Sequence, residues 1–154
     1  SDVGGVKLNV KDAATVRAEF ERMIQIKDTT AILLQPMLSG SELFVGGKRD
    51  ERFGAMVLCG MGGIFIEVLK DVVAGLAPIA TPEAMEMIAK LRSVKILDGV
   101  RGQAPIPREK FAEVVSRLSV LMTVAPEIFE MDLNPLLGTE KGVVAVDARI
   151  RIAR

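Results

Sequence analysis

A hairpin pattern near the C-terminus constrains the fold of this chain more than any other feature. Residues 130–135 read Glu-Met-Asp-Leu-Asn-Pro, and after a glycine-bounded turn residues 143–147 read Val-Val-Ala-Val-Asp. Strand side chains alternate between faces, so two antiparallel strands would place Asp132 and Asn134 on one face, with Asp147 within reach on the returning strand. Such oxygen donors suit Mg²⁺, which takes few protein ligands and fills its octahedron with water and substrate phosphates. The hairpin therefore predicts a metal–nucleotide site.

An alternative for this hairpin is purely structural. Asn-Pro pairs commonly begin turns, so Asn134 would then only cap a turn before Pro135.

The remaining chain mixes strand-like and helix-like segments. Apolar or alternating runs predict strands at residues 6–10, 31–34, 42–45, 53–59 and 64–69. Apolar residues at helical spacing predict helices that begin after Asp12, at Thr81 or Pro82, and at Pro107. Short loops make neighbouring strands antiparallel. We therefore expect an α+β fold, with a mostly antiparallel sheet and packed helices, rather than a doubly wound sheet.

Composition excludes several classes of function. The 154 residues suffice for one domain with a core, and 20 basic residues balance 20 acidic ones, which gives no nucleic-acid footprint. Because the chain has no histidine, a serine triad, an imidazole metal site and a phosphohistidine are excluded within it. Cys59, the only cysteine, lies in an apolar run and is expected to be buried. With no membrane-length apolar stretch and no signal pattern, we expect a cytoplasmic protein without a membrane partner.

Two further segments are candidates for phosphate binding. Gly60, Gly62 and Gly63 form a glycine-rich turn between predicted strands, where the backbone can approach a phosphate closely. The alternative is an ordinary hairpin or bulge. Arg101 lies between two glycines, which suits bidentate phosphate recognition, although a loop cation capping a helix C-terminus explains it equally well.

Several motifs, in order, resemble the ATP-grasp domain of ADP-forming acyl-CoA synthetases, the group that includes succinyl-CoA synthetase. They are an initial Gly-Gly-Val, Gln-Pro-Met at 35–37, Gly-x-Gly-Gly-x-x-x-Glu at 60–67, Gly-Val-Arg-Gly at 99–102 and Asp-x-Asn-Pro at 132–135. The resemblance covers essentially the whole chain and implies the C-terminal lobe of an ATP-grasp fold. It implies that Asn134 and Asp147 hold the magnesium that bridges nucleotide phosphates, with Asp132 as an accompanying acid.

The resemblance also implies nucleotide contacts elsewhere. The backbone of Gln35, Pro36 and Met37 would hydrogen-bond the adenine edge, and Glu42 would face the ribose or a phosphate-binding base. The phosphate end of the cleft would be lined by Gly60, Gly62, Gly63 and Glu67, and Arg101 is the further phosphate candidate.

The activity implied is that of an acid–thiol ligase: acyl-CoA, ADP and phosphate convert reversibly to acid, CoA and ATP. Residues 1–154 look like one ATP-grasp lobe, so we expect a fragment that lacks the N-terminal lobe and is inactive alone. Its expected partners are the nucleotide, that lobe, and a CoA-binding domain or subunit of the same enzyme. Alternatives are a nucleotide-sensing module of an acetyltransferase-fused acyl-CoA-binding protein and a structural interaction domain.

Overall fold

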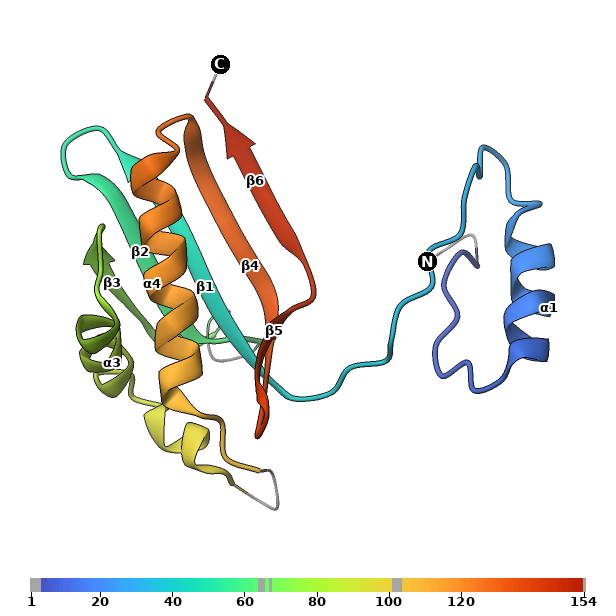
Figure 1. Cartoon of the computed structure of the whole chain (residues 1–154), viewed down its shortest axis with the longest axis horizontal. Coiled ribbons are helices and arrows are strands. Elements are labelled where there is room, and N and C mark those ends of the chain that lie inside the picture. Colours follow the sequence, from blue (N-terminus) through green and yellow to red (C-terminus); the bar gives the residue numbers. More distant parts are fainter. Residues whose placement is uncertain (1–3, 64–65, 67, 101–103, 154) are drawn as a thin grey trace. The chain divides into compact units, whose positions relative to one another are not determined.

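The chain comprises two compact units. The structure is a computed structural model that describes residues 4–63, 66, 68–100 and 104–153 (Figure 1). The first unit spans Ser1–Leu38 and the second spans Ser39–Arg154.

The first unit contains helix α1, Ala13–Met23. Asp12 caps its N-terminus: the Thr15 backbone N–H donates to Asp12 Oδ1 at 2.7 Å, and the Thr15 hydroxyl donates to Oδ2 at 2.9 Å. This cap confirms the predicted helix start. The strands predicted at 6–10 and 31–34 are wrong, because the described part of this unit contains no strand ladder and Leu33 is 79% exposed.

The second unit is built on an antiparallel sheet, which has six strands over the described residues. They are β1 (Ser41–Asp50), β2 (Gly54–Met61), β3 (Val72–Leu76), β4 (Ile128–Thr139), β5 (Gly142–Ala145) and β6 (Ala148–Ile152). The order is β3-β2-β1-β4-β5, and β6 also pairs with β4. The β1–β2 hairpin confirms the strands predicted at 42–45 and 53–59, and the antiparallel α+β class is confirmed.

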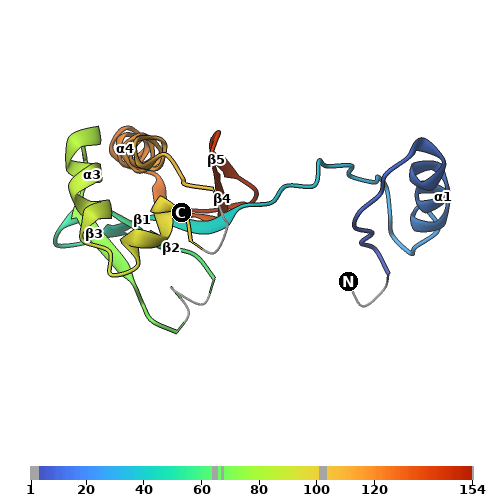
Figure 2. The same cartoon turned by 90° about the horizontal axis from the view of Figure 1, so that it is seen from below.

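Helices α3 (Thr81–Ala89) and α4 (Arg108–Val124) lie on one face of this sheet, as Figure 2 shows. The short 3₁₀ helix η1, Val94–Asp98, joins them along the chain. Both predicted helices are confirmed, since Pro82 lies in the first turn of α3 and Pro107 is the N-cap of α4. Among the described residues, no helix combines the length and apolarity needed to cross a membrane.

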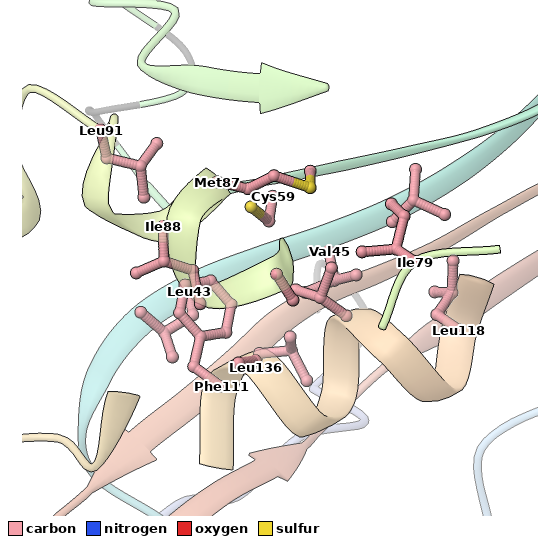
Figure 3. Packing of buried hydrophobic residues seen from close by; sticks show 14 of the residues in the cluster. Leu43, Val45, Cys59, Ile79, Met87, Ile88, Leu91, Phe111, Leu118 and Leu136 are labelled. Atoms are coloured by element: carbon pink, nitrogen blue, oxygen red, sulfur yellow. The ribbon is translucent and has the colours of Figure 1, made fainter. Parts of the chain in front are cut away.

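The core fills the space between these helices and the sheet (Figure 3). Leu43 and Phe111 are fully buried there, and each such side chain contributes about 1.5–3 kcal/mol relative to exposure. Helix α4 lies so close to β1 that a Cβ atom on Gly47 would lie 2.7 Å from Met122 Cγ. Cys59 is also fully buried, as predicted. The opposite face of the sheet therefore remains available for polar side chains.

The strand predicted at 64–69 is wrong for the residues that the structure describes. Ile66 is helical, and Val68 and Leu69 lie in a turn, while 64, 65 and 67 lie outside the described residues. Gly63 takes a φ of +56°, which turns the chain away from the direction of β2. The strand that pairs with β2 is instead β3, which begins after Asp71.

Candidate functional site

The two halves of β4 pair with different strands, and this arrangement creates the candidate site. Leu133 pairs with β6 and Leu136 pairs with β5, so residues 134–135 lie opposite residues 146–147, where β5 has ended and β6 begins. Figure 1 shows β5 and β6 along different halves of β4. A 3.1 Å backbone hydrogen bond from residue 146 to residue 135 closes this junction. The structure thus brings the predicted ligands Asn134 and Asp147 together.

A β-bulge sets the direction of side chains at this junction. Between Leu136 and Leu133, β4 has two residues where β1 has only Phe44. Bulges redirect side chains at such points. Met131 and Leu133 pack against the core, so Asp132 points to the opposite face. Asn134 follows Asp132 by two positions and is exposed. The predicted sharing of one face by Asp132 and Asn134 agrees with this register.

Asp147 is exposed and has a local hydrogen-bond partner. Its Oδ1 accepts the backbone N–H of Ala148 at 2.9 Å, and its Oδ2 lies 3.8 Å from Arg149 Nε. No group of three His, Cys, Asp or Glu side chains gathers for a metal among the described residues. The predicted ligands are of another kind, namely the carboxylates of Asp132 and Asp147 and the amide of Asn134. This set fits Mg²⁺, because hard oxygen donors in small number leave positions for water and phosphate oxygens.

The glycine-rich segment meets Glu42 at the end of β2. The Gly62 backbone N–H donates to the Glu42 carbonyl at 2.7 Å, and a Cβ atom on Gly62 would lie 2.9 Å from Glu42 Cβ. A Cβ atom on Gly63 would lie 2.8 Å from Glu42 Oε2. Glu42 itself pairs with Leu137 of β4. Three predicted nucleotide contacts are therefore adjacent, and Glu42 lies on the strand beside the Asn134 junction.

Gly60 has a packing role in the structure. A Cβ atom there would lie 2.5 Å from the Asp71 carbonyl oxygen, so only glycine allows β3 to approach this closely. This contact accounts for Gly60 without a phosphate.

The other predicted contacts are not tested by this geometry. Glu67 and Arg101 lie outside the described residues. Gln35, Pro36 and Met37 lie in the first unit, are exposed, and belong to no helix or strand. Their proposed adenine contact remains a prediction.

Sequence reasoning missed Asp71, which is 5% exposed. It accepts backbone N–H groups from Arg92 at 3.0 Å and Ser93 at 2.8 Å, and it accepts the Ser93 hydroxyl as well. Burial opposes ionisation, but these hydrogen bonds outweigh it and hold the pKa of Asp71 below its usual value. A surface hollow of about 390 Å³ lies beside it, lined by Leu69, Asp71, Arg92, Ser93, Lys95 and Ile96. The only sign of this buried carboxylate in the sequence was a charged residue immediately before an apolar run.

Arg149 was also missed. It follows Asp147 by two positions, a spacing that in a continuous strand would place both side chains on one face, although β6 begins only at Ala148. That spacing was the available signal.

Comparison with known proteins gives a consistent result. A family model described as the ATP-grasp domain matches residues 1–152. The chain is 43% identical over 157 residues to acetate–CoA ligase (ADP-forming) I of Archaeoglobus fulgidus, a match that covers 97% of this chain and 23% of that protein. It is 39% identical over 158 residues to acetate–CoA ligase (ADP-forming) I subunit beta of Pyrococcus furiosus, covering 97% of this chain and 68% of that subunit. The chain thus spans only part of each relative.

Solved structures agree with these relatives. ACD1 of Ca. Korarchaeum cryptofilum in complex with coenzyme A superposes with a TM-score of 0.89 at 36% identity, over 99% of this chain and 70% of that one. Acetyl-coenzyme A synthetase 1 of the same organism, in complex with coenzyme A and Mg-AMPPCP, gives a TM-score of 0.87 at 37% identity, with the same coverage.

Proposed function

The chain belongs to the ATP-grasp domain family, in the branch found in ADP-forming acetate–CoA ligases, and from this membership we propose that it is the nucleotide- and magnesium-binding part of an ADP-forming acyl-CoA ligase. The reaction is the reversible conversion of acyl-CoA, ADP and phosphate to acid, CoA and ATP. The relatives are ligases, which favours catalysis over the nucleotide-sensing alternative.

The observation that carries this proposal is the junction between β5 and β6. Asn134 and Asp147 lie opposite one another there, exposed, with Asp132 on the face of the sheet that α3 and α4 leave uncovered. In the proposal, Asn134 and Asp147 hold Mg²⁺ and Asp132 accompanies them. Bound Mg²⁺ would neutralise charge on the phosphate oxygens, which is the contribution such ions make in phosphoryl transfer.

The remaining residues position the nucleotide. Gly62 lies too close to Glu42 Cβ to carry a side chain, and Gly63 has a φ of +56°, which favours glycine. Because the Gly62 N–H already donates to the Glu42 carbonyl, the proposal assigns the Gly63 amide to phosphate. The backbone of residues 35–37 would contact adenine. In the proposal, Glu42 faces the ribose or a base that binds phosphate.

The proposed partners follow from the length of the relatives, which extends beyond the matched region. We expect this lobe to work with a second ATP-grasp lobe and a CoA-binding domain or subunit, in the cytoplasm. Alone, it is expected to be inactive.

Paired substitutions in the full-length protein test the metal assignment. Asn134→Ala and Asp147→Ala should each reduce magnesium-dependent activity and affinity for Mg-AMPPCP, because each removes an oxygen donor from an exposed position rather than from the core. One lost charge-assisted contact corresponds to about 1.5–3 kcal/mol, or roughly ten- to a hundredfold. Activity assays, calorimetry and circular dichroism measure the effect and the fold.

Glu140→Ala is the matched control, since Glu140 is an exposed carboxylate in the turn of the same hairpin. It should behave like the parent. Parent-like turnover in both Asn134→Ala and Asp147→Ala would remove the metal assignment.

A further inference from the structure

The uncovered face of the sheet carries two charged side chains opposite one another, on β4 and β6, beside the proposed metal junction. Asp132 of β4 pairs with Gly46 of β1 on one side and with Arg149 of β6 on the other. Since Met131 and Leu133 pack into the core, Asp132 points away from α3 and α4. Arg149, directly opposite in register, shares that face. The guanidinium therefore belongs to the same surface as the proposed metal ligands.

Arg149 is placed beside two carboxylates but is weakly engaged. Its Nε lies 3.8 Å from Asp147 Oδ2, beyond hydrogen-bond distance, and its side chain is 81% exposed. Asp132 lies across the ladder from it. Among the described residues it has no closer ion pair, so its N–H donors are directed to solvent on the uncovered face.

Arg151, two positions further along β6 and on the same face, is held by contacts with neighbouring side chains. Its Nη2 lies 2.9 Å from Glu130 Oε2, and its guanidinium carbon lies 4.3 Å from the centroid of the Phe129 ring. Both arginines thus share a strand and a face, but Arg151 is bound within the sheet and Arg149 is not.

We propose that Arg149 binds a phosphate oxygen of the nucleotide at the metal junction. This inference rests on the proposed function. Asp132 and Asp147 attract both the metal and Arg149, and two cations held near the same carboxylates repel each other. An anionic phosphate between them removes that conflict, and a guanidinium suits phosphate through its fork of N–H donors. Arg149 therefore disfavours the metal alone and favours the metal–nucleotide complex.

The consequence is an effect of opposite sign on two ligands. In the full-length protein, Arg149→Ala should bind Mn²⁺ alone a few-fold more tightly, because a like charge has gone. The same variant should bind Mg-AMPPCP about tenfold more weakly or worse, because a charge-assisted hydrogen bond has gone. Arg149→Lys should recover part of the nucleotide affinity, since it restores the charge without the fork. Spin-resonance titration measures Mn²⁺, and calorimetry measures Mg-AMPPCP.

Arg151→Ala is the matched control and should leave both affinities within about twofold of the parent, as its contacts are internal to the sheet. If the parent itself fails to bind Mg-AMPPCP, the proposed function is wrong. If the parent binds and Arg149→Ala binds Mg-AMPPCP equally well, the inference alone is overturned. If Arg149→Ala lowers the affinity for Mn²⁺ and for Mg-AMPPCP alike, Arg149 only supports the carboxylates, and the inference that it contacts phosphate is again overturned.

Discussion

Replacing Asp71 with asparagine should destabilise the second unit through a small change in a buried group. Asp71 Oδ1 accepts the Arg92 N–H, and Oδ2 accepts both the N–H and the hydroxyl of Ser93. An asparagine has only one acceptor oxygen, so its NH₂ group must face a donor in either orientation. Hydrogen bonds to charged groups contribute about 1.5–3 kcal/mol each, and losing at least one predicts that Asp71→Asn lowers the free energy of unfolding by about this amount.

The effect should depend on pH. The folded state holds the pKa of Asp71 below its value of 3.8 in the unfolded chain. The stabilisation is therefore fully present above pH 4 or so, and it is lost as pH falls through the lower, folded pKa. The difference in free energy of unfolding between the parent and Asp71→Asn should accordingly shrink in acid.

Urea unfolding followed by circular dichroism, at neutral and acidic pH, measures both quantities. Asp98→Asn is the control: Asp98 lies in the neighbouring η1, and its exposed carboxylate lies 2.6 Å from Arg108 Nη2. Exposed ion pairs contribute at most about 1 kcal/mol, so the control should change little. Equal destabilisation by Asp71→Asn and Asp98→Asn, or a difference that does not change with pH, would refute the reasoning.

Two further predictions concern buried groups. Ser119 Oγ accepts the Ile79 N–H at 2.9 Å and is fully buried, so Ser119→Ala should lower the free energy of unfolding by about 1–3 kcal/mol, more than Ser116→Ala, in thermal unfolding. A loss no larger than that of Ser116→Ala would contradict this. Burial raises the pKa of the Cys59 thiol to about 12, so a disulfide reagent at pH 8 should modify the urea-unfolded chain but not the folded one. Rapid modification of the folded chain would contradict that.

The helices were predictable because their signals are local. Asp12 caps α1 through its own side chain, and prolines mark the first turns of α3 and α4. The β1–β2 hairpin was equally local, since Asp50 accepts the N–H groups of Arg52 and Phe53 and closes the tight turn. Each of these features depends on residues within a few positions of one another.

The strands that failed depend on partners far along the chain. Residues 31–34 are as apolar as a buried strand, yet Leu33 and Leu34 are exposed and no ladder forms there in the described part of the first unit. Residues 64–69 and 72–76 are both largely apolar, but 72–76 form the strand that pairs with β2, whereas the described residues 66, 68 and 69 belong to no strand. Apolar content cannot distinguish the two, because the left-handed turn at Gly63 and the close contact between Gly60 and Asp71 decide which one pairs.

The candidate site depends both on local sequence signals and on pairing between residues far apart in the chain. The proximity of Asn134 and Asp147 was predicted from a two-strand hairpin, but the structure reaches it with three strands. Pro135 has no N–H to donate, so the β4 ladder is interrupted where β5 gives way to β6. Asp147 occupies that interruption, outside both strands, and its Oδ2 accepts no backbone hydrogen bond among the described residues. The Asn-Pro pair therefore supplies an oxygen donor and also the break that lets a second donor approach it. The alternative in which Asn134 only caps a turn does not describe this structure, because Asn134 and Pro135 both lie inside β4. Metal titration of the Asn134 and Asp147 variants tests the metal assignment.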